Sequence, residues 1–429
     1  MMPMDRLDVF ELLDLADACR VPDALRARSG EIAREAAWYH DRIRDGHVPV
    51  YGATTLTGHL DDVRVSAEAA VALQRRIIDS HCIGARPFQP PATARLVGYA
   101  KACAVAAGGS GLSAGIYEHL LDALCDPAFA PEIPVSASYS CGDVIPGAHW
   151  ARALLEHGGF SGRHGLLPGD ALALINGSFV DLGTTLALVP ALRDALVACS
   201  ANAAGVARAW EHADGGGGTQ AAVSVRATPQ LMATLMLAAT TLVRVLGEEL
   251  ATPSANPLVS MQAGRIESQA SFMSPRLAVA KSALAEAVLF ASWACQGRIG
   301  AVVQRLEAGE VPGIDALDVV QVPKLTQAWL EESRLRLGRR LFASGAQTSR
   351  GIEDLWSFGT LASAQLEDGI AAWARMEATL SLLLQALEAR SREAATLVLA
   401  RLRGGDAPTT TAPGDDSLHR TITNALRDG

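Results

Sequence analysis

The sequence lacks the surplus of basic residues that nucleic-acid binding needs. Its 37 lysines and arginines stand against 46 aspartates and glutamates, which gives a net charge of −9. We therefore expect no nucleic-acid partner. The 7 cysteines are scattered and odd in number, without metal-type spacing, so no metal is expected. A reducing cytoplasm suits them, mostly as small core residues.

No signal peptide is expected, because the pattern of residues 1–20 predicts an amphipathic acidic segment without a basic start or an apolar centre. No uninterrupted apolar run is long enough to span a bilayer, which predicts no membrane partner. Strand-type alternation and internal repeats are absent as well. These absences predict a cytoplasmic protein, and 429 residues that are 49% hydrophobic suffice for a large core.

What the sequence has instead is helical periodicity, broken by short runs rich in Gly, Pro and Thr. Residues 171–212 carry almost no charge, which predicts a helix buried on all sides. Further long helices are expected at 229–248, 275–306, 322–340 and 360–402. Together they predict an all-α up-and-down bundle. We divide the chain into an N-terminal domain (1–200), a central long-helix bundle (201–402) and a C-terminal loop with a short helix (403–429).

Three small residues in a row precede an acid in the run Ser140, Cys141, Gly142 and Asp143. Because glycine tolerates strained backbone angles, the amide nitrogen of Gly142 can reach back to the carbonyl of Ser140. Closure of that ring with loss of water gives an imidazolone. Loss of sulfide from Cys141 then adds an exocyclic methylene, a strong electrophile. The alternative is a plain helix-entry turn with Ser140 or Asp143 as N-cap.

This run resembles the motif from which aromatic amino-acid ammonia-lyases and aminomutases build such a group, 4-methylidene-imidazol-5-one (MIO). Their pattern, Gly-Ser-x-Gly-Ala-Ser-Gly-Asp-Leu-x-Pro-Leu-x-His, is matched at Gly142, Asp143, Pro146 and His149. The departures from it are Tyr139 for glycine, Ser140 for alanine and Cys141 for serine.

Other breaks between helices resemble further family motifs, in the same order along the chain. The loop Tyr51-Gly-Ala-Thr-Thr is similar to the one whose tyrosine removes the β-proton of the substrate. The stretch with His81 implies a histidine- or tyrosine-type substrate, because a polar ring needs a polar partner in a dry pocket. Ala-Leu-Ile-Asn176-Gly-Ser implies an asparagine that holds the ring's carbonyl or the substrate's amino group.

The run that begins at Gln220 resembles Gln-Asp-x-Tyr-Ser-Leu-Arg-x-x-Pro-Gln. It implies that Arg226 binds the substrate carboxylate and that Gln220 assists, while Val223 replaces the family tyrosine. Phe272 remains from Asn-Phe-His-Gly and would pack against the ring and the substrate. Glu353, in a stretch similar to Ser-Ala-Gly-Gln-Glu-Asp-His-Val-Ser-Met-Gly, would face the amino group or a basic side chain.

The resemblance implies a long antiparallel helix bundle of the ammonia-lyase type, similar to fumarase and aspartase, with active-site loops between helices. It also implies a homotetramer in which each active site uses loops from three subunits. The expected activity is that of an amino-acid ammonia-lyase or 2,3-aminomutase on a histidine- or tyrosine-like α-amino acid. A divergent enzyme of this kind fits secondary metabolism.

The departures keep a second hypothesis open, in which the fold is retained without the MIO ring. Cys141, with its pKa lowered by a helix N-terminus, or Tyr51 would then act on a carboxylate-bearing substrate as an isomerase, cyclase or dehydratase. Tyr139 in place of glycine and Val223 in place of tyrosine would thin the shell around the ring. A non-catalytic scaffold is a third hypothesis, and retention of the polar set argues against it.

Overall fold

A computed structural model describes residues 8–46, 49–162, 165–211, 220–338, 347–389, 391–403 and 416–428. The chain forms two compact units, each assembled from three separate ranges. Unit 1 consists of Met1–Ala187, Val245–Val279 and Leu341–Ser363, and unit 2 of Leu188–Arg244, Ala280–Arg340 and Ala364–Gly429. The predicted domains 1–200, 201–402 and 403–429 follow chain order instead, and that division stays a prediction.

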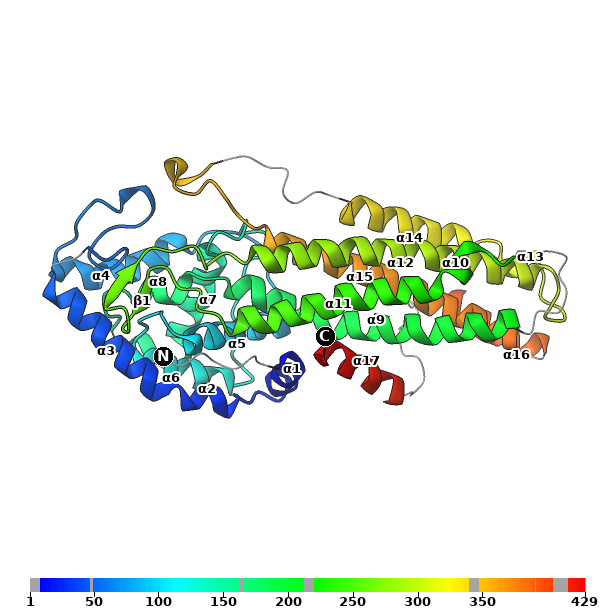
Figure 1. The fold of residues 1–429 in the computed structure, drawn as a ribbon, viewed down its shortest axis with the longest axis horizontal. Helices are drawn as coiled ribbons and strands as arrows, with labels where there is room; N and C mark the ends of the chain where they lie inside the picture. The colour runs from blue at the N-terminus through cyan, green and yellow to red at the C-terminus, as the bar shows by residue number, and fades with distance from the viewer. Residues whose placement is uncertain are drawn as a thin grey trace. The chain divides into compact units, whose positions relative to one another are not determined.

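Short helices make up most of unit 1 (Figure 1). They are α1 (Val9–Asp17), α2 (Asp23–Ala27), α3 (Ser29–Asp45), α4 (Ala67–His81), α5 (Pro91–Ala107), α6 (Ala114–Leu124), α7 (Val144–Glu156) and α8 (Asp170–Ile175), with 3-10 turns η1 (Gly58–Leu60), η2 (His157–Gly162) and η4 (Ser349–Gly351). Helix α7 packs against α4 and α8. Gly147 permits this closeness, because a Cβ atom there would lie 2.3 Å from the carbonyl oxygen of Ile175. The approach brings the residues before α7 against those after α8.

Unit 1 also contains a small hairpin of two antiparallel strands, β1 (Leu258–Ser260) and β2 (Arg265–Glu267). The sequence shows no strand-type alternation at this hairpin. Each strand has 3 residues, which is too short for an alternation of period two to stand out in the sequence. Val259 of the hairpin joins a small core with Tyr39, Ile43, Val50 and Ala53.

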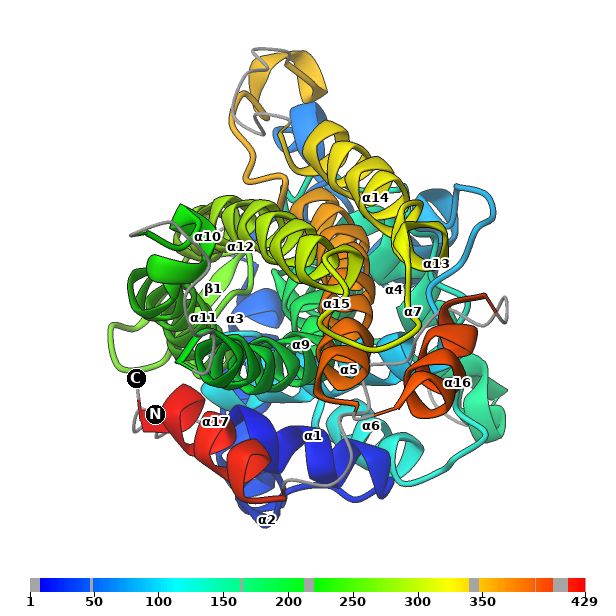
Figure 2. The same ribbon diagram turned by 90° about the vertical axis from the view of Figure 1, so that its right-hand side faces the viewer.

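Long helices dominate unit 2. The helices α9 (Phe179–Glu211), α11 (Thr228–Leu250), α12 (Pro275–Glu307) and α15 (Gly359–Glu388) each have most of their length in it, and the others are α10 (Val223–Arg226), α13 (Ala316–Val319), α14 (Val322–Leu337), α16 (Arg392–Arg403) and α17 (Asp416–Asp428). Successive long helices α9, α11 and α12 run in alternating directions (Figure 1), and Figure 2 shows them end-on. Their buried core includes Val206, Ile299, Leu380 and Leu383. The predicted all-α class with long antiparallel helices is confirmed.

Two predicted helices are interrupted. The helix expected at 171–212 divides into α8 and α9 at Asn176, and the one expected at 360–402 divides into α15 and α16. Most of the predicted loop at 403–416, and residues 339–340 of the helix expected at 322–340, lie outside the described residues.

Three helical segments are long and apolar enough, by length and composition, to cross a membrane: Asp170–Trp210, Thr228–Leu250 and Pro275–Glu307. The sequence prediction considered only uninterrupted apolar runs and therefore did not identify these segments. Their most apolar windows are 94%, 44% and 50% buried inside the protein, and for the first segment burial in a helical core accounts for the apolar composition. That the protein has no membrane partner stays a prediction.

Candidate active site

A cavity of about 510 Å³ lies in unit 1, among the loops that follow α4, α8 and the hairpin. Six of the side chains predicted for the site line it: Tyr51, His81, Cys141, Asn176, Phe272 and Glu353. Polar neighbours in the wall include Asn256, Gln269 and Asp354, while Val144, Leu172 and Met273 supply apolar surface. Segments far apart in the sequence thus meet at one cavity.

The backbone at the predicted cyclising segment is left-handed at three of four consecutive residues. The φ angles are 62° at Ser140, 82° at Gly142 and 49° at Asp143. Glycine adopts such angles freely, whereas serine and aspartate do so at a cost of order 1–3 kcal/mol each. Strain of this kind persists only where the surroundings hold it, which here means hydrogen bonds on both sides of the segment.

The first of these bonds come from within the segment and from α9. The Ser138 hydroxyl donates to Asp143 Oδ1 at 2.5 Å and accepts from the Ser140 N–H at 2.8 Å. Asp143 Oδ2 accepts from the Asp181 N–H at 3.1 Å. Asp143 is the residue before α7, yet its side chain makes no capping bond to that helix. Asp143 is thus the N-cap residue by position, as the alternative interpretation had it, but its carboxylate bonds to Ser138 and Asp181 instead of capping α7.

A second set of bonds comes from the residues that lead into α15. The N–H of Phe358 donates to the Tyr139 carbonyl at 2.9 Å, and the N–H of Thr360 donates to Ser140 Oγ at 3.0 Å. The Ser140 carbonyl accepts two bonds from Ser357, from its N–H at 3.3 Å and its hydroxyl at 3.2 Å. Both sides of the strained turn are thus fixed.

Asn176 lies directly against the glycine of the segment. A Cβ atom at Gly142 would be 3.0 Å from Asn176 Oδ1, and the Gly177 N–H donates to the Gly142 carbonyl at 3.1 Å. Asn176 Oδ1 is buried and has no hydrogen-bond partner among the described residues. A buried amide oxygen without a partner costs about 1–3 kcal/mol, so it marks a position where another polar group belongs.

Next to Asn176 is a buried amine, that of Lys101, which was not among the residues predicted from the sequence. The Lys101 amine donates to the Asn176 carbonyl at 3.1 Å and lies 4.4 Å from the centre of the Phe179 ring. Burial lowers the pKa of Lys101 to about 7. In the sequence, a single lysine within an apolar stretch of α5 could have identified Lys101 as a candidate. Through this bond Lys101 fixes the loop that carries Asn176.

Glu353 is held by two hydroxyls at one carboxylate oxygen. Oε2 accepts from Tyr139 at 2.6 Å and from Thr348 at 2.5 Å. Tyr139 was expected to thin the shell around the ring because it replaces a glycine. Here it contributes a hydrogen bond and also packs against Trp356, with ring centres 4.6 Å apart, so for this residue the expectation was wrong.

Tyr51 and Cys141 both have a raised pKa. Burial raises the pKa of the Tyr51 phenol, the hydrogen bond from the Gly58 N–H opposes that rise, and the charge of Glu353 adds to it. Burial likewise raises the pKa of the Cys141 thiol to about 12, with Glu353 and Asp143 acting in the same direction. The hypothesis that a helix N-terminus lowers the pKa of Cys141 is therefore wrong, and the thiol stays protonated at neutral pH.

A sequence profile of the aromatic amino acid lyase family matches residues 7–215 and 195–404, nearly the whole chain. The chain belongs to this family. Histidine ammonia-lyase from Deinococcus radiodurans is 27% identical over 410 residues, covering 81% of this chain and 78% of that protein. Histidine ammonia-lyase from Streptomyces griseus is 25% identical over 461 residues, covering 91% and 89%.

A solved structure matches the fold of this aromatic amino acid lyase over nearly the whole chain. The structure of phenylalanine aminomutase from Pantoea agglomerans matches it with a TM-score of 0.78 at 17% identity, covering 99% of this chain and 98% of that one. The predicted family and fold are confirmed. The protein therefore belongs to a family of carbon–nitrogen lyases.

Four predicted site residues of this lyase do not line the cavity. Ser140 and Gly142 are two of them and stand on either side of Cys141 in the strained segment. Gln220 and Arg226 are exposed residues of unit 2. The Arg226 guanidinium donates to the nearby Ala221 carbonyl at 2.9 Å, and α10, which it ends, has only 4 residues. The cavity of unit 1 is therefore formed without Arg226, the residue predicted to bind the substrate carboxylate.

The remaining predicted residues have defined neighbours in the wall. The Nδ1 atom of His81 is 2.7 Å from the Ile77 carbonyl, a contact within α4, and the ring reaches the cavity at the end of that helix. Phe272 is half-buried in the loop after the hairpin. Asn256 accepts from the Ser268 hydroxyl and the Gln269 N–H, both at 3.2 Å, which fixes that loop.

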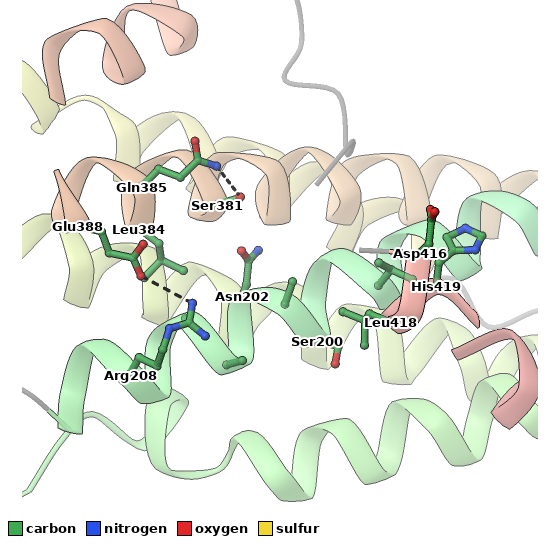
Figure 3. Close-up of a pocket in the computed structure, with 14 residues that line it drawn as sticks. Ser200, Asn202, Arg208, Ser381, Leu384, Gln385, Glu388, Asp416, Leu418 and His419 are labelled. Atoms are coloured by element: carbon green, nitrogen blue, oxygen red, sulfur yellow. Dashed lines mark hydrogen bonds and ion pairs between the residues drawn. The ribbon is translucent and has the colours of Figure 1, made fainter. Parts of the chain in front are cut away.

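A second and larger cavity, about 740 Å³, lies in unit 2 between α9, α15 and α17 (Figure 3). None of the residues predicted for catalysis or substrate binding lines it. Its charged pair, Arg208 and Glu388, is 3.7 Å apart with both side chains more than half exposed. Greater volume does not make this hollow the active site, because the strained backbone and the perturbed pKa values belong to the smaller one.

Proposed function

We propose that the protein is an amino-acid ammonia-lyase or 2,3-aminomutase that acts through an MIO ring formed from Ser140, Cys141 and Gly142. One observation carries the proposal: the left-handed backbone of this segment lies against the unpartnered oxygen of Asn176. Left-handed angles at Ser140 and Gly142 turn the chain back on itself, as ring closure requires. The buried amide of Asn176 offers a polar partner for the product.

The residues present fit this group. Asn176 and the Gly177 N–H would hold the ring from the α8 side, and Thr360 would hold the Ser140 hydroxyl beside it from the α15 side. When formed, the ring supplies an electrophilic carbon for the substrate's amino group. Family membership is consistent with this chemistry.

Other side chains of the cavity would bind the substrate and move its protons. Tyr51 would remove the β-proton, and Glu353, with one oxygen fixed by two hydroxyls, would direct the other toward the amino group. Phe272 would pack against the substrate's ring. His81 and Glu353 favour a polar or basic ring, histidine-like or tyrosine-like, over phenylalanine. The histidine ammonia-lyases among the relatives support a histidine-like substrate.

We also propose a homotetramer with shared active sites. Arg226 and Gln220 are exposed and do not line the cavity of unit 1, so a neighbouring subunit would supply the carboxylate-binding arginine. Large apolar side chains on the long helices support association: Leu237 is 69% exposed, Phe290 50% and Trp293 68%. Cytoplasmic localisation and a role in secondary metabolism remain predictions.

The alternative with Cys141 as a nucleophile is disfavoured, because the raised pKa leaves little thiolate at neutral pH.

The experiment that tests the proposed lyase or aminomutase activity is product analysis with purified protein and histidine, tyrosine or phenylalanine. Release of ammonia with an α,β-unsaturated acid identifies a lyase, and a β-amino acid without ammonia identifies an aminomutase. Turnover of none of these, or turnover to a product that keeps its α-amino group in place, contradicts the proposal.

A further inference from the structure

The carbonyl oxygen of Ser140 accepts two hydrogen bonds from one residue. Ser357 donates its N–H at 3.3 Å and its hydroxyl at 3.2 Å. Both serines are 3% exposed, so these donors act where water does not compete. Ser357 does not line the cavity, and the substrate-binding role proposed for the cavity does not use it.

Several bonds fix Ser357 relative to the segment. Its neighbour Phe358 donates to the Tyr139 carbonyl at 2.9 Å. Thr360 donates its N–H to Ser140 Oγ at 3.0 Å and its hydroxyl to the Ser138 carbonyl at 3.2 Å. Ser357 also lies just ahead of α15, a helix of 30 residues, whose N-terminal partial charge favours negative charge nearby. The donors are thus fixed in position before any reaction occurs.

We propose that Ser357 is a catalytic residue of the chain's own ring closure, because its two donors stabilise the negative charge that develops on the Ser140 oxygen. This inference rests on the proposed function, since it concerns how the MIO ring forms. Pre-positioned donors directed at a developing oxyanion are the usual means by which proteins accelerate attack on a carbonyl.

The step is balanced without an oxidant or a reductant. The Gly142 nitrogen forms a bond to the Ser140 carbonyl carbon, and the C=O electron pair moves onto oxygen, where Ser357 donates. The oxygen takes the proton released from the Gly142 nitrogen and leaves as water with the proton of the Cys141 nitrogen, which forms a C=N bond. Cys141 then loses its Cα proton and its sulfur as hydrogen sulfide.

The test follows ring closure by mass rather than by enzyme activity. The full chain is synthesised in a cell-free system, sampled at intervals, denatured and digested with trypsin, which releases residues 102–152 as one peptide. The variants are Ser357→Ala, which removes one donor, and Ser357→Thr, which keeps it. Ser363→Ala is the matched control, because Ser363 is a buried serine in the first turns of α15 and bonds to Thr184 and Thr185 instead.

We expect Ser357→Ala to lose water and hydrogen sulfide at least about 10-fold more slowly than the wild type. Ser357→Thr and Ser363→Ala should match the wild type. An alanine variant that closes as fast as the wild type, or a threonine variant as slow as alanine, overturns the role of Ser357 and leaves the proposed function intact. A wild-type peptide that never loses mass overturns both.

Circular dichroism of each variant checks that it folds. If Ser357→Ala lacks the helical signal, Ser357→Cys takes its place, because a thiol fills similar space and donates more weakly. We expect a smaller slowing for this variant than for an alanine substitution. Closure of the cysteine variant at the wild-type rate would likewise overturn the inference.

Discussion

Residues 138–143 and 220–226 both resemble family motifs, yet their surroundings differ in kind. The first segment is strained, largely buried and bonded to α9 and to the start of α15. The second includes the short helix α10 and is half exposed: Arg226 donates to the Ala221 carbonyl within it, and Arg298 of α12 donates to its Ser224 carbonyl. A motif match therefore identifies residues, while the fold decides which of them one unit can bring together. We propose that the first segment forms its ring within one chain, whereas the second acts at the active site of a neighbouring subunit.

The largest expected effect comes from a substitution in the first segment, residues 138–143. Cys141→Ala removes the sulfur whose loss creates the exocyclic methylene, so lyase or mutase turnover should fall about 1,000-fold or more. The measurement is ammonia or β-amino acid formation with the preferred substrate. Cys125→Ala, an exposed cysteine, is the matched control and should keep its activity. Retained turnover in Cys141→Ala would contradict the proposed chemistry.

The corresponding substitution in the second segment, residues 220–226, is Arg226→Ala. Loss of a charge-assisted bond to the substrate carboxylate should lower kcat/KM about 100-fold, mostly through KM. Thermal stability should be unchanged, because the side chain is exposed. An unchanged KM would remove Arg226 from the site.

Subunit mixing sharpens that result. Cys141→Ala and Arg226→Ala chains should each show little activity alone at substrate concentrations below the wild-type KM. Co-expression should restore activity under these conditions, because some shared sites then combine an intact Cys141 with an intact Arg226. Mixed tetramers without any regained activity would show that the two residues do not serve one site from different subunits.

A smaller effect is expected from Tyr139→Phe, which tests how far the first segment is held by its own network. Loss of the 2.6 Å bond to Glu353 should lower kcat/KM about 10-fold, since a bond to a charged group contributes about 1.5 kcal/mol. Tyr99→Phe is the control: its hydroxyl bonds to the Arg20 carbonyl at 2.9 Å, away from the cavity. That change should lower the melting temperature and leave kcat/KM intact; equal losses in both would contradict the role of Tyr139.

The smallest effect concerns the pH profile. Because Tyr51 would act as a base and its pKa is raised by burial, kcat/KM should rise with pH through and above neutrality. The charge of Asp61 also raises the pKa of Tyr51, so Asp61→Asn should move the rising limb slightly to lower pH. Asp62→Asn removes the same charge one residue away and should move it less. A profile that falls above neutral pH would exclude Tyr51 as the base.

The long helices were predictable because their apolar period persists over many residues. The helix expected at 275–306 is observed at Pro275–Glu307, and that expected at 229–248 at Thr228–Leu250. The break after Glu388 was missed because no proline or glycine marks it. The strands of the hairpin were too short to show a period.

The site was predictable only where a residue stands inside a recognisable motif. Tyr51, Asn176 and Glu353 were found that way and do line one cavity. Ser357, Lys101 and the bond between Tyr139 and Glu353 depend on contacts between segments far apart in sequence. No local pattern encodes such contacts, and the raised pKa of Cys141 depends on burial in the same way.

The most direct measurement is the mass of the tryptic peptide 102–152 from the purified wild-type protein after alkylation of its thiols. The unmodified peptide has three cysteines, Cys103, Cys125 and Cys141. We predict a loss of one water and one hydrogen sulfide located at residues 140–142, with two alkylated cysteines. An unmodified mass with three alkylated cysteines would contradict the account and remove the electrophile on which the proposed ammonia chemistry depends.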